Sequence, residues 1–389
     1  MRVLSVASEC VPLIKTGGLV DVVGALPAAL AMEGVRVTTL LPGYPAVTSA
    51  LGAGRSVRRL DDLFGHPARL LRGNAAGLDV IALDAPHLFA RPGNPYLAPG
   101  GGEWGDNGVR FAALGAVAAS LATQPLRGLA FDLVHAHDWQ AGLAPAYLRF
   151  AGAARRVPSV FTVHNLAFQG KFPLSLFPVL GLPPEALSVE GLEYFGSLGF
   201  LKAGLWYADR ITTVSPTYAA EIRTPEAGMG LDGLLRGRAG AVSGILNGLD
   251  LAEWNPATDP ALAAAFSAAD PSPRAANKAA LQSRLGLAPD PDAPLLGFVG
   301  RLAWQKGVDL LLGALPAILG AGAQLAVLGT GEPGLEHGCR AAAGAHPGRV
   351  GVTIGFDEAL ARLIYGGADS VLVPSRFEPC GLAQLCALR

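Results

Sequence analysis

The sequence predicts an α/β fold with two Rossmann-like, doubly wound domains that face one another across a cleft, the second of them incomplete. Short apolar runs rich in β-branched residues recur along the chain, and each is followed by an Ala- and Leu-rich helical pattern. A segment rich in proline and acidic residues separates two such series. The chain has 389 residues, which exceeds what one hydrophobic core organises, so at least two domains are expected.

The first series supplies the strands of the first domain. The apolar residues of each run are continuous rather than alternating, which is typical of parallel strands buried on both faces. We therefore expect a parallel sheet with helices on both sides. The runs cover residues 2–8, 35–41, 78–85, 131–138, 158–164, 210–215 and 241–248.

A connector precedes the second series. It contains WNPATDP, DPSPRAANK and APDPDAP, with one expected helix over residues 275–287. The expected strands of the second series open at Leu295, Gln324, Val350 and Asp369. The predicted organisation is an N-terminal lobe over residues 1–248, a connector over 249–293 and a C-terminal lobe over 294–389.

The second lobe has fewer expected strands than its fold class. A doubly wound sheet of the common type has about six strands, and each βαβ unit takes roughly 30 residues, so about 60 or more residues are expected to be missing. The chain stops at QLCALR, a stretch typical of a helix interior. The sequence therefore predicts a lobe truncated at its C-terminus.

Composition narrows the functional classes. The formal net charge is −1, which gives no electrostatic basis for binding nucleic acid or an anionic membrane. No run approaches the ~18 apolar residues of a membrane span, and no cleavable leader is evident. The four cysteines form no CxxC pair, which fits a reducing compartment and predicts a cytoplasmic protein.

KTGGLVD follows the first expected strand and precedes a helical pattern. The backbone N–H groups of Gly17 and Gly18 can approach an oxyanion there, and Lys15 adds a full positive charge. Asp21 lies in the first turn of the expected helix. The alternative is an ordinary tight turn with a solvated lysine, because the motif is neither a P-loop nor GxGxxG.

HAHDWQAG, residues 135–142, follows another expected strand. H-x-H-D invites a metal site, but no further ligand stands at a compatible spacing, so neither a metal nor a cofactor is expected. Hydrogen bonding of Asp138 and the imidazoles to sugar hydroxyls is the favoured interpretation. His164 and Asn165 end the next strand in the same way, although a histidine at a strand end also serves purely structural roles.

Three loops of the second lobe carry its chemistry. GRLAWQKG holds Arg301 and Lys306, two cations suited to a diphosphate, with a solvated loop as the alternative. LGTGEPGLE, which contains Gly331, is a second glycine-rich strand end. PSRFEPCGL places Glu378 before Gly381 at an expected helix start. Asp290 and Asp292 form a superficial DxD motif inside a proline-rich segment and are discounted.

Taken in order, these motifs resemble those of one family. KTGGL, HAHDW, TVHNLAFQG, ILNGLD followed by EWNP, GRLAWQKG and PSRFEPCGL are similar to the motifs of bacterial glycogen synthases, retaining glycosyltransferases of the GT-B type related to starch synthases. The resemblance covers essentially the whole chain. It implies ADP-glucose as the donor, an α-1,4-glucan such as glycogen as the acceptor, and retention of configuration at the anomeric carbon.

The resemblance also implies roles for matching residues. His164 would contact the transferred glucose near its anomeric carbon, and Arg301 and Lys306 would hold the ADP phosphates. Glu378 would contact the donor glucose, and these four residues would form the catalytic set. The residues expected to bind substrate are Lys15, Gly17, Gly18, Asp21, Asp138, Asn165, Asn247, Gly331, Phe356, Cys380 and Gly381.

The sequence departs from the family pattern in three places. Gln140 stands where a histidine is frequent, and Phe356 where a tyrosine is common. Family members also continue into another glycine-rich loop and a C-terminal helix. A catalytically silent, truncated synthase that binds ADP or glucan is therefore the alternative. An NAD-dependent oxidoreductase is disfavoured because the first glycine loop lacks GxGxxG.

Overall fold

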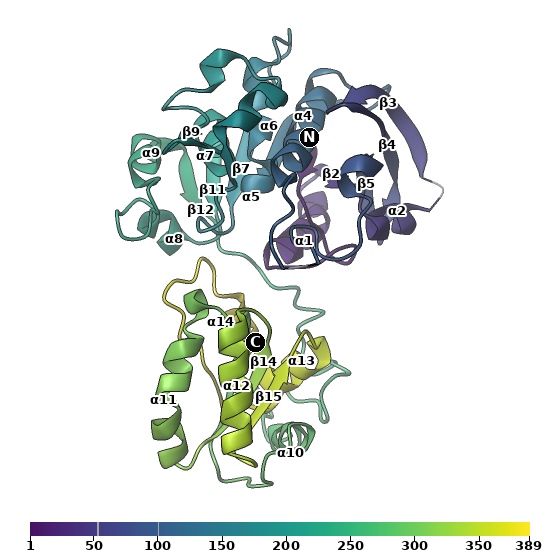
Figure 1. Ribbon diagram of the computed structural model, residues 1–389. Coiled ribbons are helices and arrows are strands. Elements are labelled where there is room, and N and C mark those ends of the chain that lie inside the picture. The colour runs from purple at the N-terminus through teal and green to yellow at the C-terminus, as the bar shows by residue number, and fades with distance from the viewer. Residues whose placement is uncertain (53, 100) are drawn as a thin grey trace. The chain divides into compact units, whose positions relative to one another are not determined.

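The structure is a computed structural model that describes residues 1–52, 54–99 and 101–389. The chain divides into two compact units, Met1–Asn247 and Gly248–Arg389 (Figure 1). Each unit contains its own open sheet. Within the three described ranges, no helix combines the length and the apolar character that a membrane crossing requires.

A nine-stranded sheet forms the first unit. Seven strands are parallel, and β4 and β3 add an antiparallel hairpin at one edge. Across the sheet the order is β12 (Val242–Gly244), β11 (Arg210–Thr213), β7 (Ser159–Val163), β6 (Leu133–His137), β1 (Arg2–Val6), β2 (Arg36–Pro42), β5 (Leu78–Asp84), β4 (His66–Ala75) and β3 (Arg55–Leu63).

The seven parallel strands coincide with the seven apolar runs of the sequence, so these strand predictions are confirmed. The β3–β4 hairpin was not predicted, because β3 is largely exposed and rich in charged residues. Arg72 of β4 donates two hydrogen bonds to Asp79 of the neighbouring strand β5, at 2.9 and 2.8 Å, which holds the hairpin to the rest of the sheet. A further three-stranded sheet, β8 (Lys171–Pro173), β10 (Ser197–Gly199) and β9 (Glu193–Tyr194), has strands too short to give a periodic signal.

Helix α4 is buried along most of its length, with Phe111 and Leu114 fully buried. It packs against α6 at Gly115, where an added Cβ would stand 3.0 Å from the Ala144 nitrogen. The α-helices are α1 (Leu19–Met32), α2 (Pro45–Leu51), α3 (Pro86–Phe89), α4 (Asn107–Thr123), α5 (Asp138–Ala141), α6 (Leu143–Phe150), α7 (Phe200–Tyr207), α8 (Pro216–Glu221) and α9 (Asp232–Gly237), with 3₁₀ turns at Leu174–Leu180, Pro184–Ala186 and Ala239–Ala241.

The second unit contains a four-stranded parallel sheet whose strands match the four expected ones. Its order is β15 (Val350–Ile354), β14 (Gln324–Gly329), β13 (Leu295–Val299) and β16 (Ser370–Val371). The helices are α10 (Arg274–Arg284), α11 (Val308–Gly320), α12 (Pro333–Ala345), α13 (Glu358–Gly367) and α14 (Leu382–Leu388), with a 3₁₀ turn at Trp304–Lys306. Leu281 of α10, Leu295 of β13 and Ile364 of α13 meet in its core.

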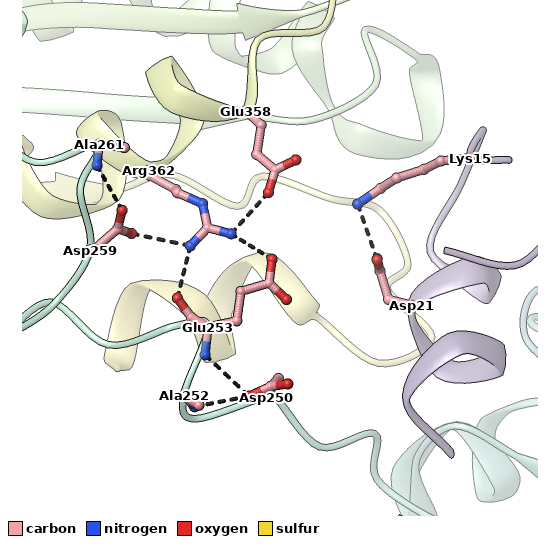
Figure 2. A network of polar contacts seen from close by, with 9 residues as sticks. All are labelled: Lys15, Asp21, Asp250, Ala252, Glu253, Asp259, Ala261, Glu358 and Arg362. Atoms are coloured by element: carbon pink, nitrogen blue, oxygen red, sulfur yellow. Dashed lines mark hydrogen bonds and ion pairs between the residues drawn. The ribbon is translucent and has the colours of Figure 1, made fainter. Parts of the chain in front are cut away.

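Arg362 of α13 holds part of the expected connector against the second unit. Its guanidinium pairs with Glu253 at 2.6 Å, Glu358 at 2.9 Å and Asp259 at 3.1 Å (Figure 2). The same guanidinium lies 4.6 Å from the ring centroid of Trp254. The segment that contains Glu253 and Asp259 is therefore fixed to α13 by charge and by stacking.

The nine-stranded and the four-stranded sheet each have one point where the strand order reverses direction. In the first unit, β2 and β5 lie on one side of β1, whereas β6, β7, β11 and β12 extend on the other. In the second unit, β14 and β15 extend from one side of β13, and β16 lies on the other. Because ligands of open α/β sheets bind at such switch points beyond the carboxyl ends of the strands, two loop pairs follow as candidates: those after β1 and β6, and those after β13 and β16.

Candidate active site

At the switch point of the first unit, Asp138 ties the end of β6 to the end of β7. It adopts φ +53°, a left-handed conformation that is uncommon for a residue with a side chain. Its Oδ1 accepts the backbone N–H of His164 at 2.7 Å, and the carboxyl group also accepts the N–H of Asn165. Burial raises the pKa of Asp138 to about 7, although the two N–H donors act in the opposite direction.

Two buried histidines lie beside Asp138. His164 Nε2 is 3.1 Å from His137 Nδ1, and His137 Nε2 is 3.3 Å from Ser5 Oγ of β1. Burial lowers the pKa of His164 to about 3 and that of His137 well below its usual value. Both rings are therefore neutral at pH 7, and each can donate one hydrogen bond and accept one.

The role of His137 as the partner of His164 was not predicted from the sequence. The HAH pattern signals two strand-end histidines, but their spacing does not tell which one meets His164. His135 contacts Thr162 instead, at 2.6 Å. In the part of the chain that the structure describes, no group of three His, Cys, Asp or Glu side chains is arranged to hold a metal ion.

The loop after β1 brings together two of the expected residues. Lys15 Nζ lies 3.0 Å from Asp21 Oδ1, with both side chains nearly half exposed (Figure 2). An exposed pair of this kind contributes little to stability. Gly18 immediately precedes α1, and an added Cβ at Gly17 would meet no atom within 4 Å. Packing inside the protein therefore gives no reason for glycine at position 17.

At the switch point of the second unit, one ion pair joins the two loops. Lys306 Nζ, after β13, lies 2.5 Å from Glu378 Oε2, after β16, and Ser375 Oγ donates to the same oxygen at 3.0 Å. The Lys306 and Glu378 side chains are 24% and 21% exposed. A cation and a carboxylate thus meet at a partly open position where the fold places ligands.

Further contacts fix these loops to each other. Arg376 N–H donates to the Gln305 carbonyl at 2.9 Å, and the Arg376 guanidinium pairs with Asp309 at 2.7 Å. That guanidinium also lies 4.4 Å from the ring centroid of Trp304. The Arg376–Asp309 pair was missed in the sequence because residues 67 positions apart leave no local pattern.

Glycines allow the loops to approach closely. Gly307 has φ +67°, and an added Cβ would stand 2.1 Å from the Pro374 carbonyl oxygen. At Gly331 an added Cβ would stand 2.3 Å from the Leu302 oxygen, which explains this predicted glycine by packing between the loops after β13 and β14. Gly381 has φ +84° and precedes α14.

The remaining expected residues lie near strand ends. Arg301 is exposed directly after β13, and Phe356, after β15, is 75% exposed. Cys380 is half-buried beside Gly381, and Asn247 is the last residue of the first unit. The contacts described above join Lys15 to Asp21, Asp138 to His164 and Asn165, and Lys306 to Glu378.

We expect Gly307→Ala to impair the second switch point. The new methyl group would overlap the Pro374 carbonyl and would require a positive φ at alanine, so the two loops must separate. The expected result is a loss of about 1–3 kcal/mol in stability, together with reduced substrate binding. Chemical denaturation and a binding assay check this. Gly313→Ala in α11, where no atom lies within 4 Å of the added Cβ, is the matched control and should not destabilise the protein.

Comparison with solved structures gives the class of protein. The catalytic domain of starch synthase IV from Arabidopsis thaliana, bound to ADP and acarbose, matches with a TM-score of 0.86 and 32% identity over 100% of this chain and 80% of that chain. The Escherichia coli structure described as trehalose-6-phosphate bound with UDP-2-fluoro glucose matches with a TM-score of 0.53 and 14% identity, which supports the fold alone. The fold is that of a GT-B glycosyltransferase.

Sequence comparison identifies the family within that class. The family model for the starch synthase catalytic domain matches residues 2–237, and that for glycosyl transferases group 1 matches residues 293–389. Glycogen synthase of Acidiphilium cryptum is 62% identical over 100% of this chain and 81% of its own length, and glycogen synthase 2 of Bradyrhizobium diazoefficiens is 59% identical, with 80% of its length covered. The chain belongs to the bacterial glycogen synthase family and is a hexosyltransferase that elongates glucan.

Proposed function

We propose that this glycogen synthase uses ADP-glucose as its donor, adds glucose to the non-reducing end of an α-1,4-glucan with retention of configuration, and acts in the cytoplasm. The starch synthase neighbour, described as bound to ADP and acarbose, supports the choice of nucleotide. The observation that carries the proposal is the Lys306–Glu378 pair at the second switch point, where a nucleotide sugar is expected to bind.

In the second unit, Arg301 and Lys306 hold the donor diphosphate. A guanidinium binds phosphate oxygens through two parallel hydrogen bonds, and a flexible ammonium neutralises the charge that develops on the leaving ADP. Glu378, 2.5 Å from Lys306, positions that ammonium and accepts from a donor glucose hydroxyl. The Cys380 and Gly381 backbone contacts the same sugar, and Gly331 and Phe356 contribute at the neighbouring strand ends.

In the first unit, His164 donates a hydrogen bond to the transferred glucose. It does so as a neutral ring, since burial holds its pKa near 3, and Asp138 fixes its backbone. Asn165 adds a polar group beside it. The loop after β1 provides charge and accessible backbone N–H groups for the donor, through Lys15, Gly17, Gly18 and Asp21. Asn247, at the end of the first unit, also contacts substrate in this proposal.

The proposed chemistry is a same-face displacement through an oxocarbenium-like state. The departing ADP oxygen accepts the proton of the acceptor hydroxyl. Glu378 already forms an ion pair with Lys306, which makes it a poor candidate for the free nucleophile of a double displacement. A covalent glucosyl-enzyme detected by mass spectrometry with a slow, fluorinated donor would overturn this mechanism.

The decisive test is incorporation of labelled glucose from ADP-glucose into glycogen by the purified chain. Equal concentrations of UDP-glucose provide the comparison for nucleotide choice. We expect efficient transfer from ADP-glucose, and we expect Arg301→Ala to abolish most of it. Transfer from UDP-glucose alone would refute the choice of donor, and no transfer from either would refute the activity of this chain.

A further inference from the structure

A polar cavity lies in the first unit, at the carboxyl ends of β2 and β5. It has a volume of about 190 Å³ and lies between the loop after β2, the segment after α3 and the start of α4. Its polar lining comes from Tyr44, Arg91, Asn94, Trp104 and Arg110. None of the residues assigned above to donor or glucan lines it.

Arg110 brings a buried positive charge to this cavity. The side chain is 1% exposed. Its Nε donates to the Leu88 carbonyl at 2.8 Å, and its Nη1 donates to the Pro95 carbonyl at 2.8 Å and to Asn107 Oδ1 at 2.6 Å. All three acceptors are neutral, and within the described residues Nη2 has no hydrogen bond. Buried charges in proteins are normally paired with an opposite charge, so this guanidinium suits an anion.

The two acidic residues nearby, Asp106 and Glu9, do not line the cavity. Both oxygens of Asp106 accept from Arg91, at 2.7 and 2.5 Å, and the Arg91 guanidinium lies 4.7 Å from the Trp104 ring centroid. One oxygen of Glu9 accepts from the Tyr96 hydroxyl, the other has no hydrogen-bond partner among the described residues, and burial raises the pKa of the carboxyl group. The charges of Arg91 and Asp106 cancel. Arg110 therefore gives the cavity a net positive charge.

Tyr44 adds a hydroxyl without a protein partner. The residue is 4% exposed, its ring packs edge-on against Phe89, and its hydroxyl makes no hydrogen bond in the described part of the chain. Buried hydroxyls are almost always hydrogen-bonded in folded proteins. The same cavity is thus lined by the Tyr44 hydroxyl, which has no hydrogen-bond partner among the described residues, and by the Arg110 guanidinium, which has no acidic partner there.

We propose that this cavity binds a phosphate group, either free inorganic phosphate or the phosphate of a small sugar monophosphate. Arg110 supplies a charge-assisted hydrogen bond from Nη2, and the Tyr44 hydroxyl donates a second one. The volume accommodates a phosphate together with part of a small organic group. All the residues that line the cavity belong to the first unit, whereas Arg301 and Lys306 belong to the second.

The test is calorimetric titration of the full chain carrying Arg301→Ala and Lys306→Ala, so that the proposed donor site does not contribute. Inorganic phosphate and a hexose monophosphate are the two probes. We expect saturable binding of one phosphate per chain. Tighter binding of the hexose monophosphate identifies a sugar phosphate as the occupant, and equal binding identifies free phosphate. Absence of saturable binding by both probes overturns the proposal.

Two substitutions locate the site. Tyr44→Phe removes a hydroxyl that has no protein partner, so the fold should persist, and phosphate affinity should fall about 10- to 100-fold. Arg110→Lys keeps the charge but removes Nη2, and its phosphate affinity should also fall, with thermal melting as the check that it folds. Tyr194→Phe, whose hydroxyl donates to the Met229 carbonyl at 2.8 Å, is the control and should bind phosphate as before. Unchanged affinity in Tyr44→Phe overturns the proposal.

Discussion

Replacing Lys306 by alanine is expected to lower kcat for glucose transfer by about 100- to 1,000-fold. The ammonium group lies 2.5 Å from Glu378 and bridges the loops after β13 and β16, so its loss removes both a charge and a contact between the loops. The charge on the departing ADP is greatest in the transition state, and the effect should therefore appear in kcat more than in KM. Steady-state kinetics with varied ADP-glucose and saturating glycogen measure both.

Lys171→Ala provides the matched control for this prediction. Lys171 is an exposed lysine of β8 whose Nζ lies 4.8 Å from the Tyr194 ring centroid, and it has no proposed role in transfer. Its removal should leave kcat within about twofold, since solvated surface residues contribute little. A Lys306→Ala protein with a raised KM and an unchanged kcat would show that this ammonium stabilises the ground state and the transition state equally.

Acidification from pH 7 to pH 5 is expected to destabilise the first unit. His137 and His164 have folded-state pKa values below the ordinary histidine value of about 6.5, so between the folded and unfolded pKa values the unfolded chain binds more protons. The contribution of both rings is present above pH 6.5 and is lost as the pH falls; for His164, whose pKa is about 3, the loss is about 2 kcal/mol at pH 5. Asp138 acts in the opposite direction. Its raised pKa of about 7 makes the folded state bind the extra proton, which favours folding as the pH falls from 7 to 4.

Asp138→Asn separates these two contributions. The amide keeps the Oδ1 acceptor for the His164 N–H but has no titrating proton, so stability should fall more steeply with acid than in the parent protein. Hydrogen exchange of peptides covering residues 133–165, followed from pH 8 to pH 5 and corrected for the intrinsic rate, isolates this region from the second unit. Parallel pH profiles in the two proteins would refute the raised pKa of Asp138.

The parallel strands of both units could be predicted from the sequence because they are buried on both faces. Residues 80–83 and 325–328 are continuously apolar and buried, and tertiary packing does not compete with that pattern. The β3–β4 hairpin escaped prediction because Arg55–Leu63 lies at a solvated sheet edge, where charged residues obscure alternation. The helix expected over residues 275–287 forms but ends at Arg284, because Gly286, with φ +65°, follows its C-cap in the left-handed conformation.

The loops of the candidate site could be predicted because ligand-binding residues in open α/β sheets lie just beyond the carboxyl ends of the strands. Glycine and charged residues in the loops that follow β1, β6, β13 and β16 predicted these loops as candidates, and the strand order places the four loops at the two switch points. Pairings across the fold were not predictable. Lys306 meets Glu378 72 residues away, and His137 meets His164 27 residues away, at distances set by strand order rather than by any local pattern.

The three carboxylates around Arg362 determine where the chain can be cut. A fragment beginning at residue 294 would contain Arg362 and Glu358 but would lack Glu253, Asp259 and the Trp254 ring. It would also lose Leu281 from the core beneath α13. Isolated production of the second unit, for crystallisation or for nucleotide titrations, should therefore begin at Gly248, so that the guanidinium retains all its anionic neighbours and α13 its hydrophobic support.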